Sequence, residues 1–166
     1  HFAQLVYNVR KFRLEWTQLH VGEGFNPEAG FVSRSDIFMY SPEAGWNWYP
    51  KKGSVVQHTV GLDATFFYKL GQNDPYLDAF DLEEIALRPF WDIRFANSAT
   101  LRLQGIYSDL TLLLDFDPTR LQREGVFFPA GERYQFTFFN ARFQSDRRQD
   151  LSYSLRPTIG QFYTGF

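Results

Sequence analysis

The hydrophobic pattern of this chain alternates residue by residue, most clearly between Ser54 and Leu70. Every second residue gives an apolar row that runs from Val56 to Leu70 and contains one histidine, His58. The intervening row is polar apart from Phe67. A period of two is typical of a β-strand whose two faces meet different surroundings. The segment is longer than most strands of soluble domains, and it exceeds the roughly 9–11 residues that a tilted strand needs to cross a bilayer.

The same alternation recurs along the chain and predicts an all-β, antiparallel up-and-down meander of about eight long strands. The predicted strands are Ala3–Val9, Phe12–Val21, Asp36–Pro50, Ser54–Leu70, Glu84–Ala96, Thr100–Asp115, Glu132–Ser145 and Leu151–Phe166. Short and long connections alternate between them, which predicts tight turns on one rim of the sheet and long loops on the other. We also predict a bulge near Tyr107–Asp109, because the apolar set that begins at Leu101 moves by one residue before Leu110.

Aromatic residues in the apolar register favour a membrane barrel. The expected aromatic girdle consists of Trp16, Trp46, Trp48 and Trp91 near the short turns, with Tyr40 and Tyr68 toward the long loops. Such belts mark the two interfaces of a transmembrane barrel. We therefore expect residues 1–166 to form a single domain that is an outer-membrane β-barrel or a segment of a larger one. The alternative is a soluble eight-stranded β-barrel or sandwich that binds a small apolar ligand or a glycan.

Four residues fit neither interpretation easily. His58 falls in the apolar row, and Pro42, Pro89 and Pro157 fall inside predicted strands. Each proline removes a donor from the hydrogen-bond ladder of a sheet. The sequence offers no reason why these residues are tolerated.

Composition narrows the class of protein. A formal net charge of −2 argues against a nucleic-acid partner. The chain has no cysteine, which excludes disulfides, thiolate metal sites and a cysteine nucleophile. It also has no apolar run of the roughly 18 residues that a membrane helix requires. Because it begins with His1 and both ends fall in strand-like sequence, we expect a processed or partial chain.

The sequence offers no catalytic constellation, and we expect neither an enzyme nor a cofactor. Nucleophile elbows, zinc-protease motifs, P-loops and dinucleotide fingerprints are absent. Glu83 and Glu84 are neighbours on a strand, so they point to opposite faces and cannot flank one bond. Asp74, Asp78 and Asp81 are weak candidates for calcium ligands, and an ordinary polar outer loop explains them equally well.

The polar row is where function would lie if the barrel interpretation holds. Its expected members are Thr59, Asp63, Arg88, Asp92, Arg94, Arg142 and Arg156. In a membrane barrel this row faces the lumen, where mixed charges pair across strands or tune a channel. In a soluble barrel the same row is the water-exposed exterior.

Two stretches of the chain resemble a known family. They are FNPEAGFV (Phe25–Val32), with Arg34, Asp36 and the aromatic strand from Tyr40 to Tyr49 after it, and GVFFPAGERYQF (Gly125–Phe136). They resemble the uncharacterised C-terminal β-barrel domain of bacterial outer-membrane proteins that carry an N-terminal family-9-type carbohydrate-binding module. The resemblance implies an outer-membrane location, the lipid bilayer and other outer-membrane or surface proteins as partners, and a role as pore, transporter or anchor. It supplies no catalytic residues, and this chain lacks the carbohydrate-binding module.

Overall fold

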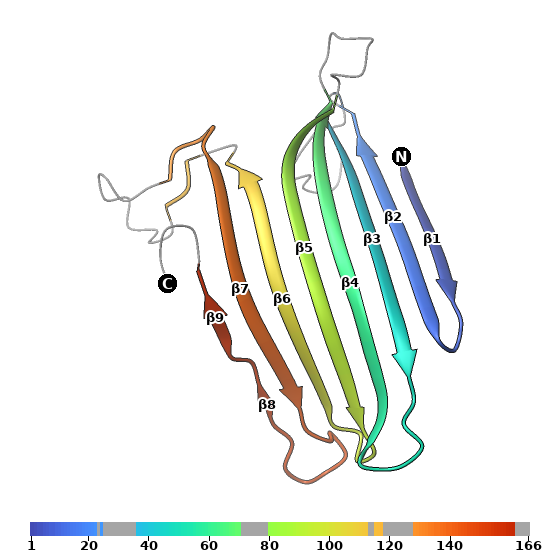
Figure 1. Ribbon diagram of the computed structural model, residues 1–166. Helices are drawn as coiled ribbons and strands as arrows, with labels where there is room; N and C mark the ends of the chain where they lie inside the picture. The colour runs from blue at the N-terminus through green and yellow to red at the C-terminus, as the bar shows by residue number, and fades with distance from the viewer. Residues whose placement is uncertain (23, 25–35, 71–79, 113–114, 118–127, 162–166) are drawn as a thin grey trace.

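The computed structural model is a single antiparallel β-sheet in which strands that follow one another in the sequence lie side by side (Figure 1). It describes residues 1–22, 24, 36–70, 80–112, 115–117 and 128–161. The strands are β1 (Phe2–Asn8), β2 (Phe12–Val21), β3 (Ile37–Trp48), β4 (Val55–Leu70), β5 (Phe80–Phe95), β6 (Thr100–Thr111), β7 (Arg133–Gln144), β8 (Ser154–Leu155) and β9 (Thr158–Gly160). In these residues no helix is long and apolar enough to span a membrane.

The predicted up-and-down meander is confirmed. Strand order in the sheet follows chain order from β1 to β8. The short strand β9 pairs with the same edge of β7 as β8 does, farther along β7. Short turns join the strands at one end of the sheet, and the strand ends at Val21, Ile37, Leu70, Phe80, Thr111 and Arg133 lie at the other (Figure 1). Within the described residues β1 pairs only with β2, so the sheet remains open between β1 and the β8–β9 edge.

The eighth predicted strand, Leu151–Phe166, is broken into β8 and β9. Arg156 and Pro157 lie between the two pieces. Because proline has no backbone N–H, it cannot donate to the ladder of β7. Its carbonyl oxygen still accepts a hydrogen bond from the backbone N–H of Ala141, at 3.0 Å, which holds the segment against β7.

The predicted bulge near Tyr107–Asp109 is wrong. The pairing of β6 with β5 and with β7 keeps one register through these residues. Register shifts occur instead between β4 and β5, at Val55/Gln57 and at Phe67/Tyr68. The apolar set on β6 therefore moves to the other face of the sheet while the backbone continues unchanged.

The two prolines inside long strands sit where the ladder is locally interrupted. Opposite Pro42, the pairing of β3 with β4 skips from Tyr40 to Glu43. Pro42 has no backbone N–H to donate. The neighbouring Ser41 hydroxyl donates instead to the carbonyl oxygen of Ala64 on β4, at 3.0 Å. Pro89 interrupts the pairing of β5 with β6 in the same way, and glycine stands opposite it at position 105.

A glycine–aromatic contact joins the middle strands. Gly61 on β4 pairs with Phe90 on β5, and Phe90 is only 5% exposed. A Cβ at Gly61 would lie 2.5 Å from the Phe90 ring and 2.5 Å from the carbonyl oxygen of Ala44. Glycine therefore lets the ring lie against the sheet, a packing that compensates for the missing side chain. The Arg102 guanidinium lies over the same ring, 4.5 Å from its centroid.

Candidate functional site

The strand register sorts the side chains onto two faces of opposite character. One face, called here the apolar face, carries large hydrophobic side chains that are exposed although they belong to central strands; for example, Val60 is 56% exposed. Its exposed large residues are Leu5, Tyr7, Trp16, Trp46, Trp48, Val60, Leu62, Trp91, Phe139, Leu155 and Ile159. In water an apolar surface of this extent would be a strong liability for association or aggregation.

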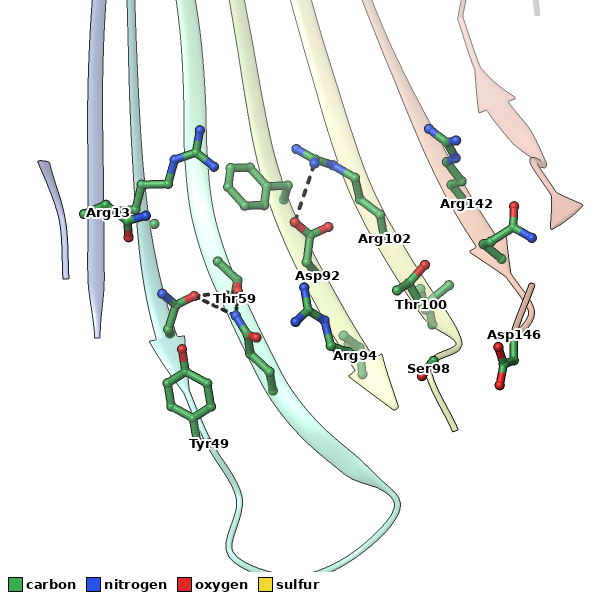
Figure 2. A pocket seen from close by; sticks show the side chains of 18 of the residues that line it. Arg13, Tyr49, Thr59, Asp92, Arg94, Ser98, Thr100, Arg102, Arg142 and Asp146 are labelled. Carbon is green, nitrogen blue, oxygen red and sulfur yellow. Dashed lines mark hydrogen bonds and ion pairs between the residues drawn. The ribbon is translucent and has the colours of Figure 1, made fainter. Parts of the chain in front are cut away.

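The other face is polar and concave. It borders an open cavity of about 1230 Å³ whose lining residues come from β1 through β7 and from the adjoining short turns. Figure 2 shows Arg13, Thr59, Asp92, Arg102 and Arg142 together on this face, from five different strands. Since strands as far apart as β2 and β7 line one cavity, the sheet curves around its polar face. The apolar face is therefore convex.

Most of the predicted polar row lies on the concave face. Thr59, Asp92, Arg94 and Arg142 line the cavity. Asp63 and Arg88 lie on the same face nearer the long loops, where they pair directly across β4 and β5 at 2.7 Å. Arg88 also donates to the hydroxyl of Thr65 at 3.0 Å. The expectation that mixed charges pair across strands holds for these two residues.

Arg156 is the exception in the predicted row. It lies in the break between β8 and β9 and does not line the cavity. The prediction placed Arg156 inside one continuous eighth strand, which the structure divides at Pro157. The pairing with β7 keeps one register on both sides of the break, so the backbone of Arg156 lies opposite Arg142.

Further polar residues of the cavity occupy the polar positions of the alternation and could have been assigned from it. Asn47, Gln57 and Thr59 form one cluster, in which the Thr59 hydroxyl donates to the Asn47 amide oxygen at 2.7 Å. Arg102 lies 3.5 Å from Asp92, and Arg13 lies 3.7 Å from Glu43.

The turn after β7 adds a charged pair to the rim of the cavity. The Arg148 side chain donates to the Asp146 carboxylate at 2.9 and 3.0 Å, and its backbone N–H does so at 2.9 Å. Hydrogen bonds from the Arg148 side chain, and then from its backbone, hold the pKa of Asp146 below its ordinary value. Nη2 of Arg148, which donates to Asp146, also donates to the Ser98 hydroxyl at 2.7 Å, and this hydrogen bond joins two short turns.

His58 lies within the aromatic cluster at the short-turn end of the apolar face. Its ring lies 5.1 Å from the Trp48 ring and 5.7 Å from the Trp91 ring, measured between centroids. The indole N–H of Trp91 donates to Nδ1 of His58 at 3.2 Å. The histidine therefore completes an amphipathic aromatic belt, which accounts for its place in an apolar row.

A second aromatic cluster lies nearer the long loops. Trp16 stands directly opposite Pro42, four residues along β3 from Trp46, and its ring is 4.2 Å from that of Tyr40. Trp16 therefore belongs with Tyr40 and Tyr68, and the sequence-based placement of Trp16 beside the other tryptophans is corrected. Trp16, Phe38, Tyr40 and Tyr68 line a shallow apolar hollow of about 420 Å³. Together with Phe66, whose ring lies 5.7 Å from that of Tyr40, they form what is called here the second belt.

One charged cluster interrupts the apolar face at the level of this second belt. Asp109 on β6 lies opposite Ile85 on β5, and Ile85 lies opposite Phe66 on β4, which belongs to the second belt. The Asp109 carboxylate is 7% exposed and accepts hydrogen bonds from Arg133 at 2.6 Å and from Gln135 at 2.9 Å. From this point toward the long loops, β6 and β7 carry polar side chains on the face that is apolar elsewhere. This change of polarity, and not a bulge, explains why the apolar residues of β6 shift by one position.

The proposed calcium ligands receive no support from the geometry. Asp74 and Asp78 lie outside the described residues, and Asp81 is described only by its backbone, at the start of β5. In the part of the chain that the structure describes, no three acidic or histidine side chains gather closely enough to hold a metal ion.

The stretch Phe25–Val32, which carries the most specific part of the family resemblance, also lies outside the described residues, as does Arg34. Asp36 is described and adopts a left-handed backbone conformation, with φ of 59°. Comparisons of the whole chain with protein-family models, with curated proteins and with solved structures give no match.

Proposed function

We propose that this chain forms part of the wall of a β-barrel in the bacterial outer membrane, with the apolar face toward lipid and the concave face toward a lumen. The observation that carries the proposal is the direction of curvature. Most of the large exposed apolar side chains lie on the convex face, and most charged side chains of β2 to β6, Asp109 excepted, lie on the concave one. Transmembrane barrels have this polarity, whereas soluble barrels fill their interior with apolar side chains.

The spacing of the two aromatic belts supports the proposal. Trp48 and Phe38 stand on the apolar face of β3 at the levels of the two belts, ten residues apart. At about 3.3 Å per residue the separation is roughly 33 Å along the strand. A strand tilt of about 40° reduces this to roughly 25 Å, the usual height of the apolar band of a transmembrane barrel.

The polar cluster around Asp109 fits the same geometry. It begins at the level of the second belt, where headgroups replace hydrocarbon, and Arg133 and Gln135 extend it toward the long loops. A carboxylate held by a guanidinium and an amide is costly in hydrocarbon and well placed at a hydrated interface.

Within this setting we propose a pore or transport role for the cavity, with anchoring of a surface module as a second role. The cavity of about 1230 Å³ and its charged wall support the pore role. Anchoring rests on the resemblance to outer-membrane proteins that carry a carbohydrate-binding module, and it requires no solute to pass. The soluble alternative, a barrel or sandwich that binds an apolar ligand or a glycan, would require a partner or ligand to cover the convex face.

Fractionation of cells that produce the protein tests the location. We expect the protein in the outer-membrane fraction, retained after washing with alkaline carbonate and with urea, and released only by detergent. The detergent-extracted protein should migrate faster on a gel before boiling than after, because closed barrels resist dodecyl sulfate. A monodisperse protein in detergent-free buffer would contradict the proposal and favour the soluble alternative.

A further inference from the structure

The wall of the cavity carries an excess of positive charge. Seven arginines and three carboxylates line it, although the whole chain has a net charge of −2. Each of these carboxylates already has an arginine partner: Glu43 with Arg13 at 3.7 Å, Asp92 with Arg102 at 3.5 Å, and Asp146 with Arg148 at 2.9 Å. Each carboxylate of the wall is therefore neutralised by one arginine, and the remaining arginines give the wall a net positive charge.

Four arginines of the wall have no carboxylate partner within the described part of the chain: Arg10, Arg94, Arg142 and Arg147. Arg10 lies over the ring of Tyr49, 5.5 Å from its centroid. Arg94 and Arg142 project from long strands and are exposed on the concave face, and Figure 2 draws no hydrogen bond or ion pair from either of them to another residue shown there. They are the positive groups that an incoming solute would meet.

The pairing of β6 with β7 places Arg142 directly opposite Arg102. Directly opposed residues have Cβ atoms about 4.5–5.5 Å apart, and like charges in this position destabilise a sheet. Asp92 offsets part of the charge of Arg102 from the other side, and it leaves Arg142 uncompensated. Arg94 lies two residues beyond Asp92 on β5, so three guanidinium groups line neighbouring strands in one part of the wall.

We propose that Arg94, Arg102 and Arg142 form a binding site for small oxyanions dissolved in the lumen, of the phosphate or carboxylate class. The proposal rests on the proposed function, because it takes the concave face to be the lumen wall. Guanidinium groups bind such anions through paired N–H donors, and an anion between Arg102 and Arg142 would turn their repulsion into attraction. A pore with this wall would favour anions over cations.

Calorimetric titration of inorganic phosphate into the purified full chain tests the site. The titration is done at low ionic strength, in detergent micelles, or in plain buffer if the protein proves soluble. We expect saturable binding that weakens at least tenfold in the double variant R94Q/R142Q and that falls as salt is added. The matched control is K51Q/K52Q, which also removes two positive charges, at exposed positions of the β3–β4 turn that do not line the cavity, and which should bind phosphate as the parent does.

The outcomes separate a binding site from a structural effect. R94Q/R142Q breaks no ion pair among the described residues and relieves a repulsion, so it should fold and be at least as stable to denaturant as the parent. No saturable binding by the parent, or equal affinity in R94Q/R142Q and K51Q/K52Q, overturns the inference. Competition by phosphatidylglycerol added to the micelles would overturn its assignment to dissolved anions. Phosphate binding by a protein found in the soluble fraction would retain the anion site while the membrane proposal fails.

Discussion

Replacing Leu62 by arginine distinguishes a wall that faces lipid from one that faces water. Leu62 is 46% exposed on the convex face and pairs with Ala44 and Pro89 on its two neighbouring strands. On a surface in water, such a substitution usually changes stability by no more than about 0.5 kcal/mol. Near the midplane of a bilayer, an arginine on the lipid face of a barrel costs about 2–4 kcal/mol.

The structure places Leu62 inside the apolar band. It lies two residues from Val60, which Trp46 and Trp91 flank, and four residues from Phe66 in the second belt. These intervals correspond to roughly 7 and 13 Å along the strand. Arginine at this position can reach neither belt without bending its side chain along the barrel, so we expect a cost of about 2 kcal/mol or more.

The assay is folding into lipid vesicles along a guanidinium titration, followed by tryptophan fluorescence and by heat-modified mobility. The matched control is Leu155→Arg, in which the same substitution is made at a 58%-exposed convex position. Leu155 pairs with Phe143, in the row of His58, so its arginine lies at the interface and should cost about 0–1 kcal/mol. If both variants stay within about 0.5 kcal/mol of the parent, the convex face does not meet hydrocarbon and the reasoning fails.

Three further substitutions test local features. Gly61→Ala should destabilise the sheet by about 1–3 kcal/mol in chemical denaturation, because its Cβ would lie 2.5 Å from the Ala44 carbonyl oxygen, which is backbone and cannot move aside. Ser41→Ala should cost about 1 kcal/mol by removing the hydroxyl donor beside Pro42, and a smaller loss in the double variant S41A/P42A, which regains a backbone N–H, would confirm that cause. Asp146 has a lowered pKa, so its contribution to stability is present above the pKa of the unfolded chain and is lost as the pH falls through the folded value; D146N should abolish that part of the acid dependence measured by thermal unfolding.

Alternation was sufficient to predict the strands and their order. Phe12–Val21 was predicted with the bounds that β2 has, and the long strand Ser54–Leu70 differs from β4 by one residue. The reason is physical: one face of each strand carries mostly apolar side chains and the other mostly polar ones, so the period of two is strong and a one-residue slip would reverse it. At Pro157 the ladder is interrupted between β8 and β9, and it resumes at Thr158 in the same register with β7, so a single predicted strand appears as two short ones.

The exchange of faces on β6 and β7 could not be read from the sequence. A bulge and a change in which face is polar both shift the apolar residues by one position along the strand. Only the residues paired with β6 on its neighbouring strands distinguish the two cases. Asp109 finds Arg133 and Gln135 across the sheet, at a sequence separation of 24 and 26. The anion site has the same origin, since Arg102 and Arg142 meet only through the register of β6 with β7.

The two open edges of the sheet bear on the membrane proposal, because their backbone groups lack hydrogen-bond partners among the described residues. In hydrocarbon each unpaired backbone N–H or C=O costs several kcal/mol, and only closed barrels avoid this cost in a β-structure. All seven residues of β1 are exposed, and within the described residues β1 has no strand on its far side. A wall that faces lipid therefore requires strands beside β1 and beside the β8–β9 edge, from this protein or from another copy. Closure would enclose the polar face completely, so the arginines without partners would line an aqueous lumen while the convex face remained in contact with lipid.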